Sequence, residues 1–355
     1  MAKVLLAQPR GFCAGVEMAI KALSWMVRVF EPPVYCYHEI VHNKVVVEAF
    51  EALGVVFVDD VAEVPPGRPV MLSAHGSAPE VEAEAGRHGR VVVDACCPLV
   101  TKVHHELKVR ARKGYTVIYV GHSGHEEAIG TMAVAPEAVR LVESEEDVAA
   151  LEIPVGEPVA LLAQTTLAHD EWSGIVERAK ERYPELWMPG RSDLCYATTN
   201  RQAAMRALAP RCDAVVVIGS ANSSNTVSLA KTAALYGAPR VHRVNSLGEL
   251  PGDLEGVVGV TAGASAPEWL VEEVLTELDP ADGVELVGVT EEDEYFPPPP
   301  ELRDLLKVVA CAAAALVGAP AGGEPPTAAD RATPAASVLR PPGGAGRAGV
   351  AVLSG

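Results

Sequence analysis

The feature that most constrains the fold is an alternation of short apolar runs and amphipathic segments along most of the chain. Seven runs rich in Val, Ile, Leu and Ala have the length of strands: KVLLA, PVMLSA, RVVVDA, YTVIYVG, PVALLAQ, DAVVVIGS and GVVGVTAG. Such continuous runs are typical of parallel strands that helices cover on both faces. Between them, apolar periodicity predicts helices over residues 14–30, 99–113, 169–183, 197–208 and 266–278. The alternation predicts an α/β fold with mainly parallel sheets.

An internal repeat predicts how the chain is divided into domains. The segments QPRGFCAGVEMAI, VVDACCPLVTKVHHEL and SDLCYATTNRQAAMRAL each place a Cys directly before a helical pattern. The intervals between these cysteines, 97 − 13 = 84 and 195 − 97 = 98 residues, each suit one small α/β unit. We therefore expect three similar domains, over residues 14–97, 98–194 and 195–300, the last of which includes residues 1–13.

The chain after residue 300 has a different character. Residues 301–318 are apolar enough for one terminal helix packed on the body, but they are too few to span a bilayer. Residues 319–355 consist mostly of Ala, Gly and Pro and have too few large apolar side chains to build a core. We expect a terminal helix followed by a disordered tail.

Composition limits the partners and the compartment. The 355 residues include 47 acidic and 29 basic side chains, and the formal charge of −18 argues against broad attraction to nucleic acid or to an anionic membrane. Seven cysteines, an odd number spread along the chain, argue against a disulfide framework and favour a reducing compartment. The N-terminal segment lacks the hydrophobic core of a signal peptide. These observations predict a cytoplasmic protein.

Polar loops follow five of the apolar runs, at the sheet edge where ligands of open α/β proteins gather. They contain the sequences SAHG, GHSGHEE, QTT, GSANSSN and TAGAS. Hydroxyls, amides, histidines and backbone N–H groups at a helix start form a cradle for phosphate. In any one loop these residues are equally typical of turns and N-caps, but five such loops favour a binding site. The absence of Walker and G-x-G-x-x-G motifs after these strands favours a small phosphorylated substrate over a nucleotide.

Six of the seven cysteines divide into two groups. Three are predicted to be small buried side chains: Cys36, Cys212 and Cys311. Three others stand at predicted helix starts, where the helix dipole favours a thiolate: Cys13, Cys97 and Cys195. Zinc sites usually show paired Cys-x-x-Cys or clustered His spacing, which this chain lacks. Three thiolates from three domains suit an iron–sulfur cluster in which one iron has no protein ligand.

Two positions stay open on spacing alone. Cys96 adjoins Cys97, and we favour Cys97 as the ligand because Pro98 can begin a helix directly after it. Glu127 lies two residues after His125 in a glycine-flanked loop, where it is either a proton donor or a solvated carboxylate. The histidines outside the polar loops are predicted to be surface or packing residues: His38, His88, His104, His105, His169 and His242.

With these residues assembled, the sequence resembles the 4-hydroxy-3-methylbut-2-enyl diphosphate reductase (LytB/IspH) family, which catalyses the last step of the non-mevalonate isoprenoid pathway. The resemblance runs from about residue 4 to residue 303. Its stretches follow the family's order: PRGFCAGVEMAI, HEIVHNKVVVEAF, SAHG, DACCPLVTKVH, GHSGHEEAIGTM, QTTL, DLCYATTNRQAA, GSANSSN and VTAGASAPEWL. It implies three α/β domains in a trefoil-like arrangement around a central iron–sulfur cluster.

The resemblance also implies roles for individual residues. The cluster ligands are then Cys13, Cys97 and Cys195. The family's proton-delivering Glu and its Thr that contacts the substrate hydroxyl match Glu127 and Thr165. The residues that match the family's diphosphate pocket are His42, His75, His125, Ser223, Ser224, Asn225 and Ser265.

The implied reaction is the reductive dehydroxylation of (E)-4-hydroxy-3-methylbut-2-enyl diphosphate to isopentenyl and dimethylallyl diphosphate. It implies a 4Fe–4S cluster with three Cys ligands and one open iron, and a small electron-transfer protein such as ferredoxin or flavodoxin as partner. Two other classes stay open: a zinc-dependent hydrolase of a small phosphate ester, and a non-catalytic phosphometabolite-binding protein. Stoichiometric zinc without iron would indicate the first, and ligand binding without turnover would indicate the second.

Overall fold

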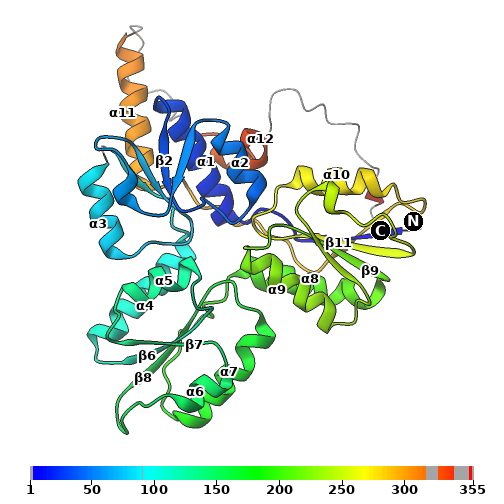
Figure 1. The fold of residues 1–355 in the computed structure, drawn as a ribbon, viewed down its shortest axis with the longest axis horizontal. Helices are drawn as coiled ribbons and strands as arrows, with labels where there is room; N and C mark the ends of the chain where they lie inside the picture. The colour runs from blue at the N-terminus through cyan, green and yellow to red at the C-terminus, as the bar shows by residue number, and fades with distance from the viewer. Residues whose placement is uncertain (1–2, 90, 317–326, 340–351, 354–355) are drawn as a thin grey trace.

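The computed structural model describes residues 3–89, 91–316, 327–339 and 352–353 (Figure 1). Three separate sheets, all with parallel strands, form three lobes around a common centre, each with its own helices. The expected α/β class and the trefoil-like layout are confirmed. Among the described residues, none of the helices combines the length and the apolar character that crossing a membrane requires.

The first lobe contains a four-stranded sheet in the order β3-β2-β4-β5. Its strands are β2 (Val34–Tyr37), β3 (Val55–Val58), β4 (Val70–Leu72) and β5 (Val92–Asp94). The helices that accompany it are α1 (Ala14–Val29), α2 (Lys44–Glu51) and α3 (Pro79–His88). Buried side chains of α1, α2 and this sheet share one apolar core, which includes Leu23, Val46 and Met71.

The second lobe contains a three-stranded sheet in the order β7-β6-β8. Its strands are β6 (Thr116–Val120), β7 (Val139–Val142) and β8 (Val159–Ala163). The accompanying helices are α4 (Pro98–Arg112), α5 (Glu126–Ala133), α6 (Glu145–Ala150) and α7 (His169–Arg182). Two separate apolar clusters involve this sheet, one around Leu161 and one around Leu162, because successive side chains of a strand point to opposite faces.

The third lobe contains a six-stranded sheet in the order β10-β9-β11-β1-β12-β13. Its strands are β1 (Lys3–Gln8), β9 (Ala214–Ile218), β10 (Val241–Val244), β11 (Val257–Ala262), β12 (Val284–Gly288) and β13 (Val352–Leu353). Its helices include α8 (Tyr196–Leu208), α9 (Ser224–Leu235) and α10 (Glu268–Leu278). The N-terminal strand β1 lies between β11 and β12, with Leu5 opposite Gly259.

The apolar pattern identified the central strands and missed shorter ones. Each of the seven runs contains a strand, and each predicted helix is present with ends within two residues. The strands that the pattern did not single out are β2, β3, β7, β10, β12 and β13. Strands such as β2, β10 and β12 combine buried residues with partly buried or exposed ones, so their composition is more mixed than that of the fully buried β8 and β9. The domain boundaries at 97, 194 and 300 stay predictions.

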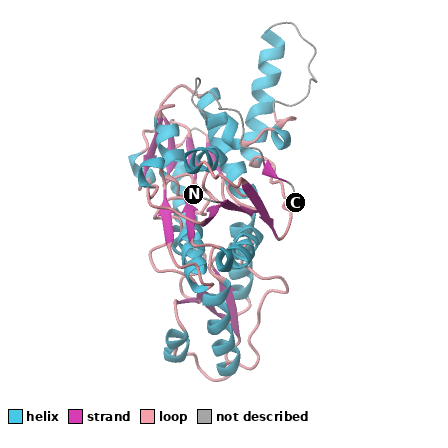
Figure 2. Cartoon of the chain, turned by 90° about the vertical axis from the view of Figure 1, so that its right-hand side faces the viewer, coloured by secondary structure: helices cyan, strands magenta, loops and turns pink. Residues whose placement is uncertain are grey.

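The terminal helix differs from its prediction in how it packs. Helix α11 (Pro300–Leu316) projects from the first lobe (Figures 1 and 2). Leu302 and Leu306 near its start are buried in the first core, whereas Val308 and Leu316 are 67% and 88% exposed. Cys311 lies on the projecting part and is exposed, so its prediction as a buried residue is wrong. Cys36 and Cys212 are buried as predicted.

Part of the predicted disordered tail is folded. Residues 327–339 form a short 3-10 turn at 330–332 and helix α12 (Ala335–Leu339), which packs on α1. The Nζ of Lys21 donates to the carbonyl oxygen of Asp330 at 2.9 Å, and the backbone N–H of Ala335 donates to Glu17 Oε2 at 2.8 Å. Composition did not predict this folded segment, because Ala335 and Leu339 pack into the core of the first lobe and do not form a core of their own. The other parts of the tail, except 352–353, lie outside the described residues.

Candidate functional site

One pocket, at the meeting point of the three lobes, brings the predicted site residues together. The loops that line it follow β1, β2, β4, β5, β6, β8, β9 and β11, since parallel strands present their carboxyl ends on one edge of a sheet. Every predicted site residue lines this pocket: Cys13, His42, His75, Cys97, His125, Glu127, Thr165, Cys195, Ser223, Ser224, Asn225 and Ser265. Residues distant in sequence therefore share one site.

The three predicted thiol ligands occupy equivalent positions. Each is the residue that precedes a helix, has an extended backbone and makes no side-chain capping bond: Cys13 before α1, Cys97 before α4 and Cys195 before α8. Each donates its backbone N–H to a carbonyl oxygen of a strand-end loop: Cys13 to Ala264 at 3.1 Å, Cys97 to Ala74 at 3.0 Å and Cys195 to Thr165 at 2.9 Å. These bonds orient three helix N-termini toward one pocket.

The space around the sulfurs fits a bound metal group. A Cβ atom at Gly15 would lie 2.7 Å from the Sγ of Cys97 and 3.9 Å from the Sγ of Cys13, so glycine leaves room where two thiols approach each other. Burial raises the pKa of all three thiols, that of Cys195 to about 12, and repulsion from the Cys13 thiolate adds to the effect at Cys97 and Cys195. Three thiolates at this place require a cation, and a sulfur-only donor set is one that iron–sulfur clusters use.

Cys96 points elsewhere. It does not line the pocket, and its Sγ accepts a hydrogen bond from the Thr101 hydroxyl at 3.4 Å. Its own thiol donates to the carbonyl oxygen of Cys97 at 3.7 Å. Adjacent residues face different directions at the start of α4, so the geometry favours Cys97 over Cys96 as a ligand.

Arg201 is a site residue that the sequence reading missed. Its side chain on α8 is completely buried, and its Nε and Nη2 donate to the carbonyl oxygen of Gly11 at 3.2 and 2.8 Å. Its Nη1 also donates to Glu292 Oε1 at 3.0 Å. Arg201 thereby holds the loop before Cys13, and its charge partly offsets the effect of burial on the pKa of that thiol. The sequence feature that could have revealed this residue is the position of Arg201 on the apolar face of the helix predicted over residues 197–208.

Glu127 and Thr165 form a buried pair. Glu127 is 2% exposed; its Oε1 accepts the backbone N–H of Thr165 at 2.7 Å, and its Oε2 accepts the Thr165 hydroxyl at 2.8 Å. Burial raises the pKa of Glu127 to about 7, although both hydrogen bonds from Thr165 favour the ionised form. Near neutral pH this carboxyl can therefore both hold and release a proton, which a solvated loop carboxylate cannot do.

His125 is fixed as a neutral donor. It caps the N-terminus of α5, where its Nδ1 accepts the backbone N–H of Glu127 at 3.1 Å. The proton of the neutral ring therefore resides on Nε2, a buried atom that has no hydrogen-bond partner in the described part of the chain. Burial lowers the pKa of His125 to about 3, with repulsion from His75 and His42 adding to the shift. An acceptor oxygen in the pocket would satisfy this N–H group.

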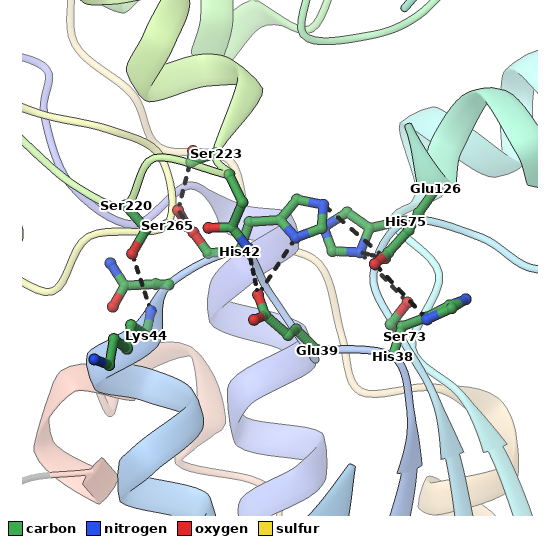
Figure 3. A network of polar contacts seen from close by, with 12 residues as sticks. His38, Glu39, His42, Lys44, Ser73, His75, Glu126, Ser220, Ser223 and Ser265 are labelled. Carbon is green, nitrogen blue, oxygen red and sulfur yellow. Dashed lines mark hydrogen bonds and ion pairs between the residues drawn. The ribbon is translucent and has the colours of Figure 1, made fainter. Parts of the chain in front are cut away.

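The other two predicted histidines are stacked and contact carboxylates (Figure 3). The rings of His42 and His75 lie 3.9 Å apart at 16°. Glu39 Oε2 lies 3.5 Å from His42 Nδ1, and Glu126 Oε2 lies 2.8 Å from His75 Nδ1. His38, predicted to be a surface or packing residue, also approaches Glu126, at 3.8 Å. The sequence analysis assigned no role to either carboxylate, although Glu39 lies within the HEIVH stretch and Glu126 within the GHEE stretch.

Neutral polar groups at the start of α9 complete the pocket. The Ser223 side chain caps this helix by accepting the backbone N–H of Thr226 at 3.3 Å. The Ser224 hydroxyl accepts a hydrogen bond from that of Thr166 at 3.0 Å, and the Ser265 hydroxyl donates to the carbonyl oxygen of His42 at 2.9 Å. The backbone N–H groups of a helix N-terminus and neighbouring hydroxyls bind anions. Fold and site together define an α/β protein in which three thiols converge beside a group of anion-binding donors.

Comparison with known proteins identifies the family. The LytB protein family matches residues 4–279, most of the chain, and the chain belongs to this family. A 4-hydroxy-3-methylbut-2-enyl diphosphate reductase of Mycolicibacterium paratuberculosis is 48% identical over 279 residues, which are 78% of this chain and 84% of the relative. The enzyme of the same name from Streptomyces avermitilis is 47% identical over 295 residues, covering 82% of this chain and 87% of the relative.

Solved structures agree with this assignment. The E-1-hydroxy-2-methyl-but-2-enyl-4-diphosphate reductase from Plasmodium falciparum superposes with a TM-score of 0.84 at 32% identity, covering 87% of this chain and 99% of that structure. A second structure, of an (E)-4-hydroxy-3-methyl-but-2-enyl diphosphate reductase described as the terminal enzyme of the non-mevalonate pathway, has a TM-score of 0.57 at 31% identity, with 79% and 99% covered.

Proposed function

We propose that this protein is an iron–sulfur reductase that converts (E)-4-hydroxy-3-methylbut-2-enyl diphosphate to isopentenyl and dimethylallyl diphosphate. The observation that carries the proposal is the pocket shared by three thiols at helix N-termini, the buried Glu127–Thr165 pair and the anion-binding donors. Membership of the LytB family, whose enzymes use an iron–sulfur cluster, and relatives named as this reductase support it.

The residues that would hold the cluster are Cys13, Cys97 and Cys195. With three protein ligands, a 4Fe–4S cluster keeps one iron open, and when bound it supplies electrons and a Lewis-acidic position for the substrate's oxygen. The sulfur-only donor set and the space left by Gly15 support this assignment. A small electron-transfer protein of the ferredoxin or flavodoxin type is the proposed source of electrons, and the cytoplasm is the proposed location.

The cradle orients the substrate. The diphosphate accepts hydrogen bonds from His42, His75 and His125 on one side and from the donors at the start of α9 on the other. The hydroxyl-bearing end then extends toward Thr165, whose carbonyl oxygen also accepts the N–H of Cys195. Fixing both ends of a flexible allylic chain removes much of the entropic cost of reaching the transition state.

Glu127 and Thr165 deliver protons to the substrate. The net reaction breaks the C–O bond of the allylic alcohol, takes up two electrons and two protons, and forms one C–H bond and one water molecule. Hydroxide is a poor leaving group, so a proton delivered from Glu127 through the Thr165 hydroxyl lets the oxygen leave as water. Protonation of the allyl anion at either end then accounts for two products.

Anaerobic purification followed by iron, sulfide and zinc analysis and a turnover assay with a chemical reductant tests the proposal. We expect brown protein with iron and sulfide, and conversion of the substrate to both products. Colourless protein with full activity would overturn the reductase assignment. Stoichiometric zinc without iron, together with hydrolysis of a phosphate ester, would support the hydrolase instead.

A further inference from the structure

Glu126, the first residue of α5, extends its side chain toward the imidazoles of His38, His42 and His75, here called the histidine group (Figure 3). One carboxylate oxygen lies 2.8 Å from His75 Nδ1 and 4.0 Å from His42 Nε2, and the other lies 3.8 Å from His38 Nδ1. The side chain is 22% exposed. Three imidazoles thus surround one carboxylate.

These contacts connect two lobes. His38 and His42 follow β2 and His75 follows β4 of the first sheet, whereas Glu126 follows β6 of the second. Burial opposes ionisation of Glu126, but the close contact with His75 and the charges that His75, His42 and His38 carry when protonated lower its pKa to about 2. The carboxylate therefore bears its negative charge at every physiological pH.

The negative charge of Glu126 lies beside the histidines that are expected to bind an anionic ligand. His42 and His75 line the pocket and are the donors expected to meet a diphosphate, which carries several negative charges. Glu126 itself does not line that pocket but contacts both donors from the neighbouring outer cleft. A diphosphate bound at the histidines would therefore be repelled by the nearby like charge of Glu126, unless the carboxylate moves.

We propose that Glu126 is an internal competitor of the substrate: its carboxylate occupies the histidine group in the ligand-free protein, and an incoming diphosphate displaces it. This inference rests on the proposed function for the chemical class of the ligand. Glu126 acts through His42 and His75 and is a positioning residue, since it does not contact the reacting atoms. In the absence of ligand it keeps the histidine group intact across the lobe boundary, at the expense of diphosphate affinity.

Calorimetric titration of the anaerobic holoenzyme with inorganic pyrophosphate tests this role. For Glu126→Gln, which keeps the shape but removes the charge, we expect about tenfold tighter binding at low salt. The gain should shrink at high salt because ions screen the partly exposed charge. Glu177→Gln, an equal change of charge at an exposed position of α7, is the matched control and should bind like the wild type. Unchanged or weaker binding by Glu126→Gln would overturn the proposal, because it would mean that the carboxylate supports the histidines.

A second variant and a kinetic readout separate this inference from the proposed function. Glu126→Asp keeps the charge but withdraws it from the histidines, so its affinity should fall between those of the wild type and Glu126→Gln. In the reductase assay Glu126→Gln should lower KM with kcat changed less than about twofold. If the wild type turns over substrate and Glu126→Gln has an unchanged KM, the role of Glu126 as a competitor is overturned and the reductase function stands. Tighter pyrophosphate binding by the variant without turnover in either protein would overturn the reductase function and leave the competitor supported.

Discussion

Two neighbouring glutamates at the start of α5 face different parts of the site, and their pKa values report what surrounds each one. Glu127 is buried beside Thr165, and burial raises its pKa to about 7. Glu126 reaches the histidine group, where close contact with His75 and the charges of protonated imidazoles outweigh burial and lower its pKa to about 2. The same side chain is therefore a proton store at one position and a fixed charge at the next.

The difference extends to the two ends of the pocket. At the thiol end, burial favours the neutral forms of Cys13, Cys195 and Glu127. At the other end, where the histidines lie, the carboxylates of Glu39 and Glu126 stay close to the rings of His42 and His75. Reductive removal of a hydroxyl from a diphosphate needs both environments, because one end must exchange protons and electrons while the other holds an anion in place.

Among variants that test the difference between the two ends of the pocket, substitutions of the three thiols should have the largest effect. Cys13→Ser should lose the iron and sulfide, the visible absorption and the reductase activity, since the serine hydroxyl is a poor iron ligand. Cys97→Ser and Cys195→Ser should behave alike. Metal analysis and absorption spectra of anaerobic protein measure the loss. Cys96→Ser is the control and should keep the cluster and the activity. If Cys96→Ser lost the cluster and Cys97→Ser kept it, the ligand would be assigned to the wrong residue.

Glu127→Gln should abolish proton delivery without disturbing either end of the pocket. We expect turnover to fall about 10²- to 10⁴-fold, the usual contribution of a positioned general acid. Iron content and pyrophosphate affinity should match the wild type, in contrast to the tighter binding expected for Glu126→Gln. Single-turnover kinetics with reduced protein would measure the effect. Undiminished turnover would remove Glu127 from the mechanism.

The pH profile tests the pKa of Glu127 directly. Glu127 donates its proton only when protonated, so the rate should fall as the pH rises through about 7, approaching tenfold per pH unit at higher pH. Thr165→Val removes the side-chain hydrogen bond that favours the ionised form, so the falling limb should move to higher pH while the rate itself drops. A limb that moves to lower pH in this variant would contradict the assignment.

The smallest effect on catalysis is expected from the C-terminal segment, which packs on α1. Leu339→Ala should lower the free energy of unfolding by about 2–3 kcal/mol, because the side chain is 5% exposed in the first core. Turnover should stay unchanged. Denaturant unfolding under anaerobic conditions measures the change, and Ser337→Ala at an exposed position of the same helix is the control. Equal stability of both variants would mean that the segment does not contribute to the core.

The fold class and most of the site were predictable from local patterns. Buried strands such as β8 and β9 consist of uninterrupted apolar residues, because both faces of a parallel sheet are covered. Motifs around Cys13, Cys97 and Cys195 marked the thiols, since a helix start is a local feature of the chain. Short and partly buried strands such as β2 and β10 lacked that signal, because their side chains meet mixed environments.

What the sequence by itself determined is the set of chemical groups and the α/β framework that presents them, because both depend on residue type and short-range spacing. The tertiary structure decided which groups share an environment. It buried Arg201 beneath the loop of Cys13, turned Cys96 away from the pocket and left Cys311 exposed on α11. It also gave two adjacent glutamates opposite pKa shifts, since burial and charge around a side chain come from segments far away in the sequence.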